Sequence, residues 1–241
     1  MSTVWSKPPR VVALTGGALS REAGFAPFDP AAMPEGLTLE DVVSREGFAR
    51  GPARVQDFYN RRRQELLAAK PNAAHEALAV LDAVRSREVL VVTRNIDDLH
   101  ERAGSQAVIH THGELLKAHC TICTNVSERY DDIAPGSECP ICGNAGHLRP
   151  HVVWVGEEPL GMANVFAALA HCQLLMAIGV PAGAEPARGF AEAARRAGAR
   201  TVEFNPEPAS PPGLFPGMFD ERIPGPLAET VPDYVKRLIA L

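Results

Sequence analysis

The sequence predicts an α/β protein with a doubly wound parallel sheet, a helical insertion and a small metal-binding module. Three observations support this fold class. Short apolar segments each end in a glycine or a polar loop, helical patterns separate them, and four of the five cysteines form Cys-x-x-Cys pairs. The chain has 241 residues, 46% of them hydrophobic, so it is long enough to bury a sizeable core.

The apolar segments are expected to form neighbouring parallel strands. They are Arg10 to Leu14, Val89 to Thr93, Leu174 to Ile178 and Thr201 to Phe204. Helical patterns over Ala73 to Val84 and Ala187 to Ala197 lie between them, as in a sheet covered by helices on both faces. Ligands of such sheets bind at the carboxyl ends of the strands, so the loops there are the candidate functional segments.

We expect one domain over residues 1–241 with three parts. The large lobe comprises residues 10–36, 70–115 and 148–241; the helical insertion comprises residues 37–69; the metal-binding module comprises residues 116–147. Within the insertion, Phe48, Val55, Phe58 and Tyr59 offer an apolar face. The Pro-rich residues 206–216 are expected to form a surface loop.

Charge and hydropathy exclude two classes of partner. The net charge is -5 without a long basic or acidic block, so we expect no direct binding to nucleic acid or to anionic lipid. The apolar stretch from Val165 to Ala184 is interrupted by His171, Gln173 and several turn residues, which predicts a helix followed by a buried strand and no membrane span. No convincing signal cleavage site follows the apolar run at Val11 to Leu19, so a cytoplasmic location is expected. We also expect the protein to be a monomer.

Two cysteine pairs predict a metal site. Cys120 and Cys123 form one pair, Cys139 and Cys142 form the other, and residues 124–138 separate them. This spacing lets both thiolates of a pair reach one ion, and four thiolates leave no open position for water. We therefore expect a structural Zn²⁺ rather than disulfides, contributing on the order of 10 kcal/mol to folding of the module. Cys172 lies in an apolar helical pattern and is expected to be a core residue.

Four segments resemble motifs of the sirtuin family. Residues 15–28 resemble the opening Thr-Gly-Ala-Gly-Ile-Ser-Ala-Glu-Ser-Gly-Ile-Pro-Thr-Phe-Arg, and residues 94–100 resemble Gln-Asn-Ile-Asp-Gly-Leu-His. Residues 110–115 (HTHGEL) are similar to the family's His-Gly catalytic segment, and residues 148–154 (LRPHVVW) follow the second cysteine pair as in the family. The match covers nearly the whole chain in the family's order and implies a Rossmann-like sirtuin fold.

The resemblance implies an NAD-dependent protein-lysine deacylase. Sirtuins transfer an acyl group from lysine to ADP-ribose and release nicotinamide, so NAD is the expected cosubstrate and an acylated protein or peptide the expected partner. His112 would act as general base on a ribose hydroxyl, a role that suits an imidazole because its pKa lies near neutrality. Asn95 and Asp97 match the pair that positions a water and holds the nicotinamide carboxamide. Turn formation and loop capping remain open as simpler roles for these residues.

The resemblance also implies a set of cofactor-binding residues. They are Gly16, Gly17, Ala18, Ser20, Phe28, Asp29, Arg94, Asn95, Asp97, His112, Gly179, Val180, Pro181 and Asn205. The segment Thr15 to Ser20 follows the first predicted strand and opens a helix, an arrangement that offers backbone N–H groups to a phosphate. It does not match Gly-x-Gly-x-x-Gly, and a tight structural turn would look similar.

Substrate-binding residues follow from the same resemblance. Tyr59 and Arg62 stand at the Tyr-x-x-Arg spacing of the bacterial and mitochondrial branch that binds succinyl or malonyl carboxylates. Residues three apart share a helix face, and arginine can meet a carboxylate with two parallel bonds, although a solvated basic face is an alternative. Val152, Val153 and Trp154 resemble the extended segment to which the peptide adds as a strand.

The expected NAD pocket departs from the family pattern. Ala18 replaces a glycine, Asp29 an arginine and Arg94 a glutamine, whereas Val180-Pro181 replace Thr-Ser. Val155 replaces an aromatic residue on the substrate strand. The charge of Arg94 would face the cationic nicotinamide, and the methyl group of Ala18 would obstruct the pyrophosphate. We expect Asp29 and Arg94 to form an ion pair across the pocket, each offsetting the other's charge.

Three functions remain open on the sequence alone. The first is a deacylase, acting as a deacetylase or desuccinylase. The second is a sirtuin-like regulatory binding protein with weak NAD binding, and the third is altered chemistry, either ADP-ribosyl transfer or NAD hydrolysis. His112 and Asn95 favour the enzymatic functions, whereas Asp29 and Val180-Pro181 favour the regulatory one.

Overall fold

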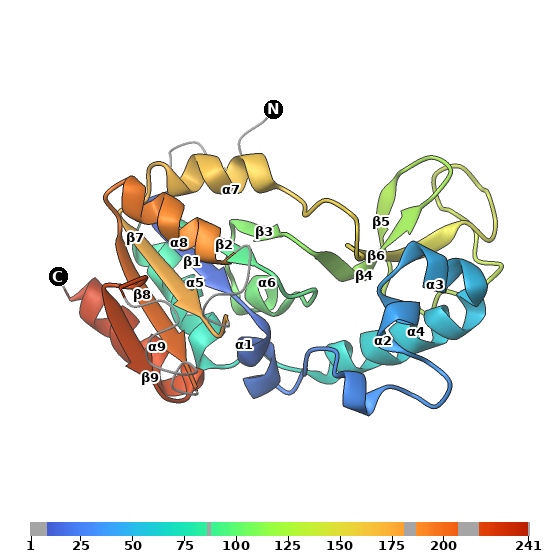
Figure 1. The fold of residues 1–241 in the computed structure, drawn as a ribbon, viewed down its shortest axis with the longest axis horizontal. Coiled ribbons are helices and arrows are strands. Elements are labelled where there is room, and N and C mark those ends of the chain that lie inside the picture. Colours follow the sequence, from blue (N-terminus) through green and yellow to red (C-terminus); the bar gives the residue numbers. More distant parts are fainter. Residues whose placement is uncertain (1–8, 86–87, 181–186, 207–216, 241) are drawn as a thin grey trace.

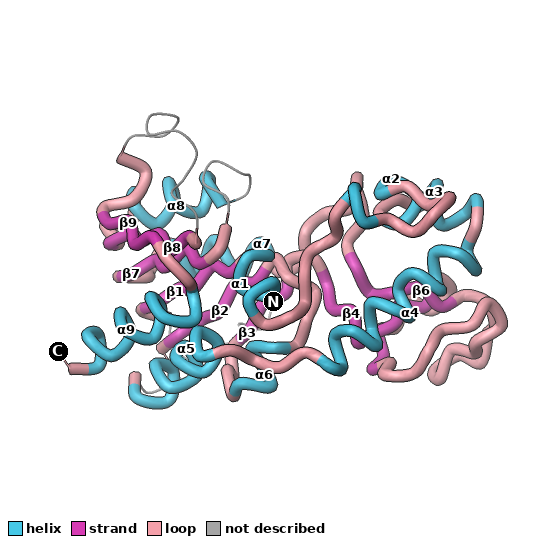
Figure 2. The backbone as a smooth tube through the Cα atoms, turned by 90° about the horizontal axis from the view of Figure 1, so that it is seen from below, coloured by secondary structure: helices cyan, strands magenta, loops and turns pink. Residues whose placement is uncertain are grey.

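Two bodies of secondary structure lie at opposite ends of the molecule, with loops running between them (Figure 1). This arrangement comes from a computed structural model that describes residues 9–85, 88–180, 187–206 and 217–240. One end holds a parallel sheet covered by helices, and the other holds short helices against a small antiparallel sheet. Figure 2 shows the same division from below.

The larger sheet confirms the predicted fold class. It has six parallel strands in the order β3-β2-β1-β7-β8-β9. Their bounds are β1 Val11–Thr15, β2 Val89–Thr93, β3 Val108–His110, β7 Leu174–Ile178, β8 Arg200–Asn205 and β9 Glu221–Pro224. The four predicted strands occupy the centre of this order. The edge strands β3 and β9 were not predicted, because they are too short to show a clear pattern.

Helices cover both faces of the larger sheet, as the nearly continuous apolar strands require. Side chains that alternate along β1 point to opposite faces, so Val11 and Ala13 belong to one apolar cluster and Val12 and Leu14 to the other. Helices α1, α5 and α9 pack on the first face and α7 and α8 on the second. Their bounds are α1 Gly17–Glu22, α5 Ala73–Val84, α7 Met162–Leu169, α8 Ala187–Arg196 and α9 Leu227–Ile239.

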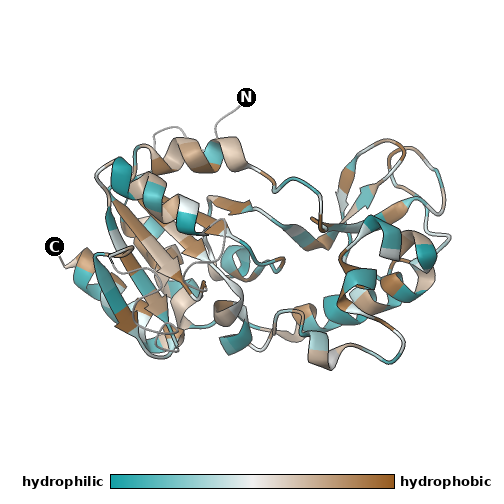
Figure 3. Ribbon diagram, in the orientation of Figure 1, coloured by the Kyte–Doolittle hydropathy of each residue, from teal (hydrophilic) through white to brown (hydrophobic). Residues whose placement is uncertain are grey.

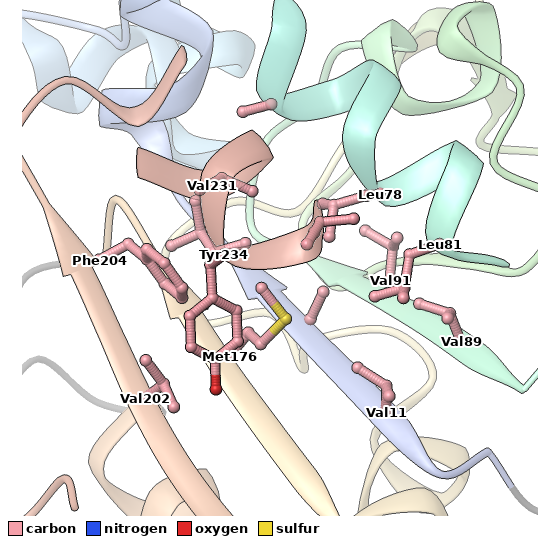
Figure 4. Packing of buried hydrophobic residues seen from close by; sticks show 14 of the residues in the cluster. Val11, Leu78, Leu81, Val89, Val91, Met176, Val202, Phe204, Val231 and Tyr234 are labelled. Atoms are coloured by element: carbon pink, nitrogen blue, oxygen red, sulfur yellow. The ribbon is translucent and has the colours of Figure 1, made fainter. Parts of the chain in front are cut away.

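The first face shows how the strands and helices interlock (Figure 4). Leu78 and Leu81 of α5 lie against Val89 and Val91 of β2, and Tyr234 of α9 lies against Phe204 of β8. The Phe204 and Tyr234 rings meet edge to face with centroids 5.2 Å apart, a favoured geometry for aromatic pairs. The core therefore fixes the strands whose carboxyl ends carry the candidate loops.

The smaller end combines the predicted helical insertion with a three-stranded sheet in the order β5-β4-β6. Its elements are η1 Pro30–Ala32, α2 Leu39–Val42, α3 Arg45–Arg50, α4 Pro52–Ala68, β4 Gly113–Cys120, β5 Val126–Glu128 and β6 Leu148–Val152. Buried residues of α4, including Phe58, Tyr59 and Leu66, pack with Leu115 of β4 and Trp154 in a third apolar cluster. The remaining helix, α6 Leu99–Ala103, follows the loop after β2.

Hydropathy follows this architecture, with hydrophobic strands at the centre of the larger sheet and hydrophilic stretches on the outer helices (Figure 3). The apolar stretch after Val165 is divided between α7 and β7, as predicted. In the described parts of the chain, no helix has the length and apolar character needed to cross a membrane. Cys172 is buried among the residues of the second face, as expected for a core cysteine.

Candidate active site and metal centre

A cavity of about 230 Å³ opens where the carboxyl ends of β1 and β2 meet the smaller end of the molecule. Its walls come from the loop after β1, the loop after β2, helix α4 and the segment after β6. The lining residues are Gly17, Ser20, Phe25, Ala26, Pro27, Phe28, Val43, Arg62, Arg94, Asn95, Ile96, Asp97, His112, Val152 and Val153. The structure therefore brings together ten residues singled out in the sequence, at the carboxyl ends of the strands where ligands of doubly wound folds bind.

His112 enters the cavity from the turn between β3 and β4. Its Nδ1 lies 3.0 Å from the carbonyl oxygen of Arg94, which can only accept, so Nδ1 carries the proton and Nε2 is left as the basic nitrogen. Burial, followed by the positive charge of Arg94, lowers the pKa of His112, and the hydrogen bond to the carbonyl opposes this. The imidazole is thus neutral and basic at physiological pH.

Gly113 holds this turn in place. It has φ +82°, and a Cβ there would lie 2.2 Å from the carbonyl oxygen of His151. The backbone on the other side of this turn is also held closely, because the Val153 N–H donates to the His112 carbonyl at 2.8 Å. A side chain at position 113 would therefore push the start of β4 away from β6 and move His112.

Asn95 and Asp97 line the cavity from the loop after β2. The Asn95 side-chain amide donates to the Gly16 carbonyl at 3.1 Å, which links this loop to the end of β1. The Ser20 hydroxyl donates to Asp97 at 2.6 Å, and the Leu99 N–H donates to the other carboxylate oxygen at 3.3 Å. Burial raises the pKa of Asp97, and these two hydrogen bonds oppose the shift. Both side chains are fixed before any ligand arrives.

The glycine loop after β1 touches the cavity with only part of its length. Gly17 and Ser20 line it, whereas Gly16 caps α1 and donates its N–H to the Ile178 carbonyl at 3.0 Å. Ala18 does not line the cavity: it packs against the first-face cluster, and its N–H points to the Gly179 carbonyl at 3.4 Å. Ala18 is therefore not a wall of this cavity, and obstruction of the pyrophosphate by its methyl group stays a prediction.

Gly179 and Val180, the described residues of the loop after β7, are not among the residues that line the cavity. Gly179 has φ +63°, and a Cβ there would meet Leu227, Leu19 and Ala18 at 2.9 to 3.1 Å. Val180 is buried in the second-face cluster, and its carbonyl accepts from the Asn205 side-chain amide at 3.4 Å. Pro181 and the Pro-rich loop from residue 207 lie outside the described residues.

The predicted ion pair between Asp29 and Arg94 does not form. Asp29 is exposed, and its carboxylate accepts the Ala31 N–H at 2.9 Å as the cap of η1. Arg94 lines the cavity instead, with a shielded Nε that no described residue hydrogen-bonds. Burial is the cause that lowers the pKa of Arg94, with no contribution from a carboxylate. The local need to cap a helical turn therefore decides where Asp29 points.

Aromatic rings and Arg62 form the wall next to α4. The Arg62 guanidinium lies 4.2 Å from the Phe25 ring centroid and 5.5 Å from that of Phe28, and it hydrogen-bonds Glu65 and the Ala26 carbonyl. Burial lowers the pKa of Arg62, and the charge of Glu65 opposes this. Arg62 is therefore a cavity residue, as the sequence predicted.

Tyr59 lies elsewhere, although it is one helical turn from Arg62. It is completely buried, its hydroxyl donates to the Val42 carbonyl at 2.7 Å, and the same oxygen accepts from Trp154 Nε1 at 3.0 Å. Trp154 is also absent from the lining and packs between Phe48 and the Arg149 guanidinium. The structure thus brings Val152, Val153 and Arg62 to the cavity and places Tyr59 and Trp154 behind the wall.

Several lining residues were missed in the sequence. Phe25, Ala26 and Pro27 come from the segment between α1 and η1, Val43 follows α2, and Ile96 stands between Asn95 and Asp97. They contribute apolar surface, and such residues carry no distinctive spacing. The signal that existed was position, because Phe25 to Pro27 lie within the motif that ends at Phe28.

The four paired cysteines converge at the far end of β4. All four sulfur atoms lie within 4.8 Å of one another, with Cys120 and Cys142 at 3.8 Å and Cys123 and Cys139 at 3.7 Å. A tetrahedral Zn²⁺ with bonds of about 2.3 Å to sulfur separates its ligands by about 3.8 Å. Two of the sulfur pairs stand at this separation, so the cluster fits a zinc ion, and its four thiolates leave no position for a substrate.

The two cysteine pairs use the same local backbone. The first cysteine N–H of each pair bonds the carbonyl five residues on, at Asn125 and Asn144, with a length of 3.0 Å in both cases. The residue after each pair, Thr124 or Gly143, has a positive φ and donates its N–H to the first cysteine carbonyl at 2.9 Å. Two matching knuckles thus face one another, as the sequence spacing predicted.

Comparison with known proteins gives one family. The sequence profile described as the Sir2 family matches residues 16–186. A relative named NAD-dependent protein deacylase from Salmonella typhimurium is 44% identical over 234 residues, which cover 96% of this chain and 84% of that protein. A relative with the same name from Vibrio parahaemolyticus is also 44% identical over 234 residues and is covered to 95%.

Solved structures give the same result. A Sir2 homologue in complex with NAD superposes with a TM-score of 0.83 at 30% identity, covering 95% of this chain and 90% of that one. A mutant Sir2 homologue in complex with ADP-ribose superposes with a TM-score of 0.81 at 31% identity, covering 96% and 93%. The sequence profile, the relatives and the fold therefore agree on one family.

Proposed function

This chain belongs to the Sir2 family, and on that basis we propose that it is an NAD-dependent protein-lysine deacylase. When bound, NAD would supply ADP-ribose as the acceptor of the acyl group, with nicotinamide as the leaving group. The proposed cosubstrate-binding residues in the cavity are Gly17, Ser20, Phe28, Arg94, Asn95, Asp97 and His112. The fixed positions of Asn95 and Asp97 suit them to hold a polar ligand without further ordering.

The state of His112 is the observation that carries this proposal. Its Nδ1 proton is held by the Arg94 carbonyl, so Nε2 can accept a proton from a ribose hydroxyl. Its lowered pKa keeps it unprotonated to lower pH than a free imidazole. A general base of this kind contributes about 10²–10⁴-fold to the rate.

The acylated peptide is proposed to add as a strand beside the segment after β6. Val152 and Val153 line the cavity, so a peptide along them would present its acyl-lysine to His112. Val155, which is 74% exposed, bonds Val43 through its backbone N–H at 2.8 Å and leaves its side chain free to contact the peptide. Arg62 is proposed to favour acyl groups that end in a carboxylate, since its guanidinium shares the cavity.

A regulatory binding protein with impaired catalysis is the second candidate, and Arg94 is the observation that favours it. Its positive charge in the cavity opposes the cationic nicotinamide ring and the positive charge that develops on the ribose carbon as nicotinamide leaves. In the described residues no carboxylate offsets this charge. The two candidates differ in whether NAD binds and is consumed.

Calorimetric titration with NAD and with ADP-ribose separates them. The zinc-loaded protein is titrated with each, then assayed on acetyl-lysine and succinyl-lysine peptides for nicotinamide release. The deacylase proposal expects both ligands to bind and deacylated peptide to form only with NAD. Binding of neither ligand, or binding of both without deacylation of either peptide, would favour the regulatory protein.

A further inference from the structure

The charged residues of the cavity are unequally partnered. Its formal charges are carried by Arg62, Arg94 and Asp97, and His112 is its only histidine within the described lining. Arg62 is paired with Glu65, and Asp97 accepts hydrogen bonds from Ser20 and Leu99. Among the residues that the structure describes, the Arg94 side chain is the one of these three with neither an ion pair nor a hydrogen bond.

The isolation of Arg94 is visible at the atomic level. Its Nε is shielded from solvent and has no hydrogen-bond partner among the residues that the structure describes. Burial lowers the pKa of Arg94, and no carboxylate of the described residues opposes this. An arginine that is partly desolvated without a carboxylate is unfavourable in the free protein, so the site gains free energy when an anion enters.

The backbone of Arg94 fixes where this charge sits. Its N–H donates to the Thr15 carbonyl at 3.0 Å, and its carbonyl accepts from His112 Nδ1, also at 3.0 Å. The side chain therefore starts between the end of β1 and His112. The guanidinium also acts on that imidazole through space, because burial and, after it, the positive charge of Arg94 lower the pKa of His112.

We propose that Arg94 is an anion-binding residue of the cavity, which takes up negatively charged oxygen atoms of a ligand next to His112. The inference rests on the proposed function for the identity of the ligand. The anion is either the terminal carboxylate of an acidic acyl group or the pyrophosphate of the cosubstrate. The planar guanidinium can meet either group with two parallel hydrogen bonds.

A bound anion would also change the pKa of His112, the proposed base. Once the charge of Arg94 is offset, the cost of protonating His112 falls and its pKa rises towards that of a free imidazole. The other ionisable groups that share the cavity, Arg62 and Asp97, are already bonded to protein partners and stay unchanged. Anion binding and the protonation of His112 are thus linked through Arg94.

The test compares Arg94→Gln with the unaltered protein. Glutamine is the residue of the resembled family pattern, so this variant should fold. Arg94→Lys keeps the charge, and Arg61→Gln removes an exposed positive charge from the same helix as Arg62 and serves as control. Calorimetry measures binding of ADP-ribose, which carries phosphates without an acyl group, and of acetyl- and succinyl-lysine peptides.

We expect Arg94→Gln to lower one of two quantities by about tenfold or more: the affinity for ADP-ribose, or the ratio of succinyl-peptide to acetyl-peptide affinity. Arg61→Gln should lower neither. Weaker ADP-ribose binding assigns the pyrophosphate, and a lower ratio of succinyl to acetyl affinity assigns the acyl carboxylate. For the ligand that Arg94→Gln binds more weakly, Arg94→Lys should keep more affinity than Arg94→Gln. If Arg94→Gln changes both quantities by less than twofold, the inference is wrong.

The titrations with ADP-ribose and with the acyl-lysine peptides both measure binding, so they remain informative if the protein does not deacylate. An inactive protein whose ADP-ribose affinity depends on Arg94 would refute the proposed function and support the inference. A further check is the titration of His112 by NMR in the ligand-free protein, where Arg94→Gln should raise its midpoint. An unchanged midpoint would contradict the electrostatic part of the inference.

Discussion

The cysteine cluster and the cavity around His112 are both built from loops at strand ends, yet they differ in how completely the protein satisfies them. The four sulfur atoms of the cluster lie within 4.8 Å of one another, and two pairs already stand at the spacing of tetrahedral zinc ligands. In the cavity, the side chains of Asn95, Asp97 and His112 are hydrogen-bonded to protein, whereas the Arg94 side chain has no partner among the described residues. The first site needs only an ion, and the second is arranged for a larger ligand.

This difference teaches where substitution is tolerated. Each cysteine has the same task, so loss of one removes a quarter of the coordination and leaves the others uncompensated. The cavity combines residues with separate tasks, so a change at Arg94 can alter ligand preference while the position of His112 is kept by backbone contacts. We expect the cluster to control folding and the cavity to control chemistry.

Removal of zinc is the prediction with the largest effect. Chelation, or Cys139→Ser, should unfold the module that contains the cluster, because zinc binding contributes on the order of 10 kcal/mol to such sites. Circular dichroism and metal analysis measure the result. Cys172→Ala is the matched control, since this buried cysteine lies outside the cluster and should leave one zinc per chain. An unchanged melting curve after complete removal of zinc would contradict the assignment.

Acid should act on the larger sheet through two buried histidines. The rings of His75 and His100 lie 4.7 Å apart, and His100 bonds the Thr15 hydroxyl at 3.0 Å. Burial lowers the pKa of His75 to about 4 and lowers that of His100 as well. The unfolded chain therefore binds more protons below pH 6.5, and the free energy of unfolding falls as pH drops towards 4.

The contribution of His75 to this loss is about 3 kcal/mol between neutral pH and pH 4. Chemical denaturation at a series of pH values measures it, and His75→Gln should flatten the dependence by a similar amount. His171→Gln removes an exposed histidine and should leave the slope unchanged. Equal slopes for all three proteins would show that buried histidines do not set the acid limit.

A smaller effect is expected at Tyr59, which lies on α4 behind the residues that line the cavity. Tyr59→Phe removes a hydroxyl that serves the Val42 carbonyl and the Trp154 indole, so the free energy of unfolding should fall by about 1–3 kcal/mol. The ratio of succinyl to acetyl turnover should stay the same, because this hydroxyl does not reach the cavity. Tyr130→Phe, at an exposed tyrosine, is the control. A lost preference for succinyl-lysine in Tyr59→Phe would restore the role inferred from the sequence.

The central strands and the zinc knuckles could be predicted from sequence because their signals are local. An apolar run such as Val89 to Thr93 gives a buried strand in most contexts, and Cys-x-x-Cys fixes two ligands within one turn. Edge strand β9 gave no such signal, since its residues alternate between partly buried and exposed over only four positions. The division of the chain into three parts by residue ranges stays a prediction.

The side chains of the cavity were harder to predict, because tertiary contacts decide where they point. Tyr59 and Arg62 are three residues apart on α4, yet one bonds Trp154 behind the wall and the other lies against Phe25. Asp29 was expected to pair with Arg94, and the local cap of η1 holds it instead. The loops after β1 and β2, which the sequence motifs singled out, line the cavity, but the direction of each side chain within them could not be predicted.

The most direct test of the account is deacylation by His112→Ala. With zinc-loaded protein, NAD and an acyl-lysine peptide, we expect kcat/KM to fall at least about 100-fold while ADP-ribose still binds, because the variant removes the base and leaves the loops in place. Nicotinamide and deacylated peptide are measured together by mass spectrometry. If His112→Ala deacylates the peptide within a few-fold of the unaltered protein, His112 is not the base and the central claim is contradicted.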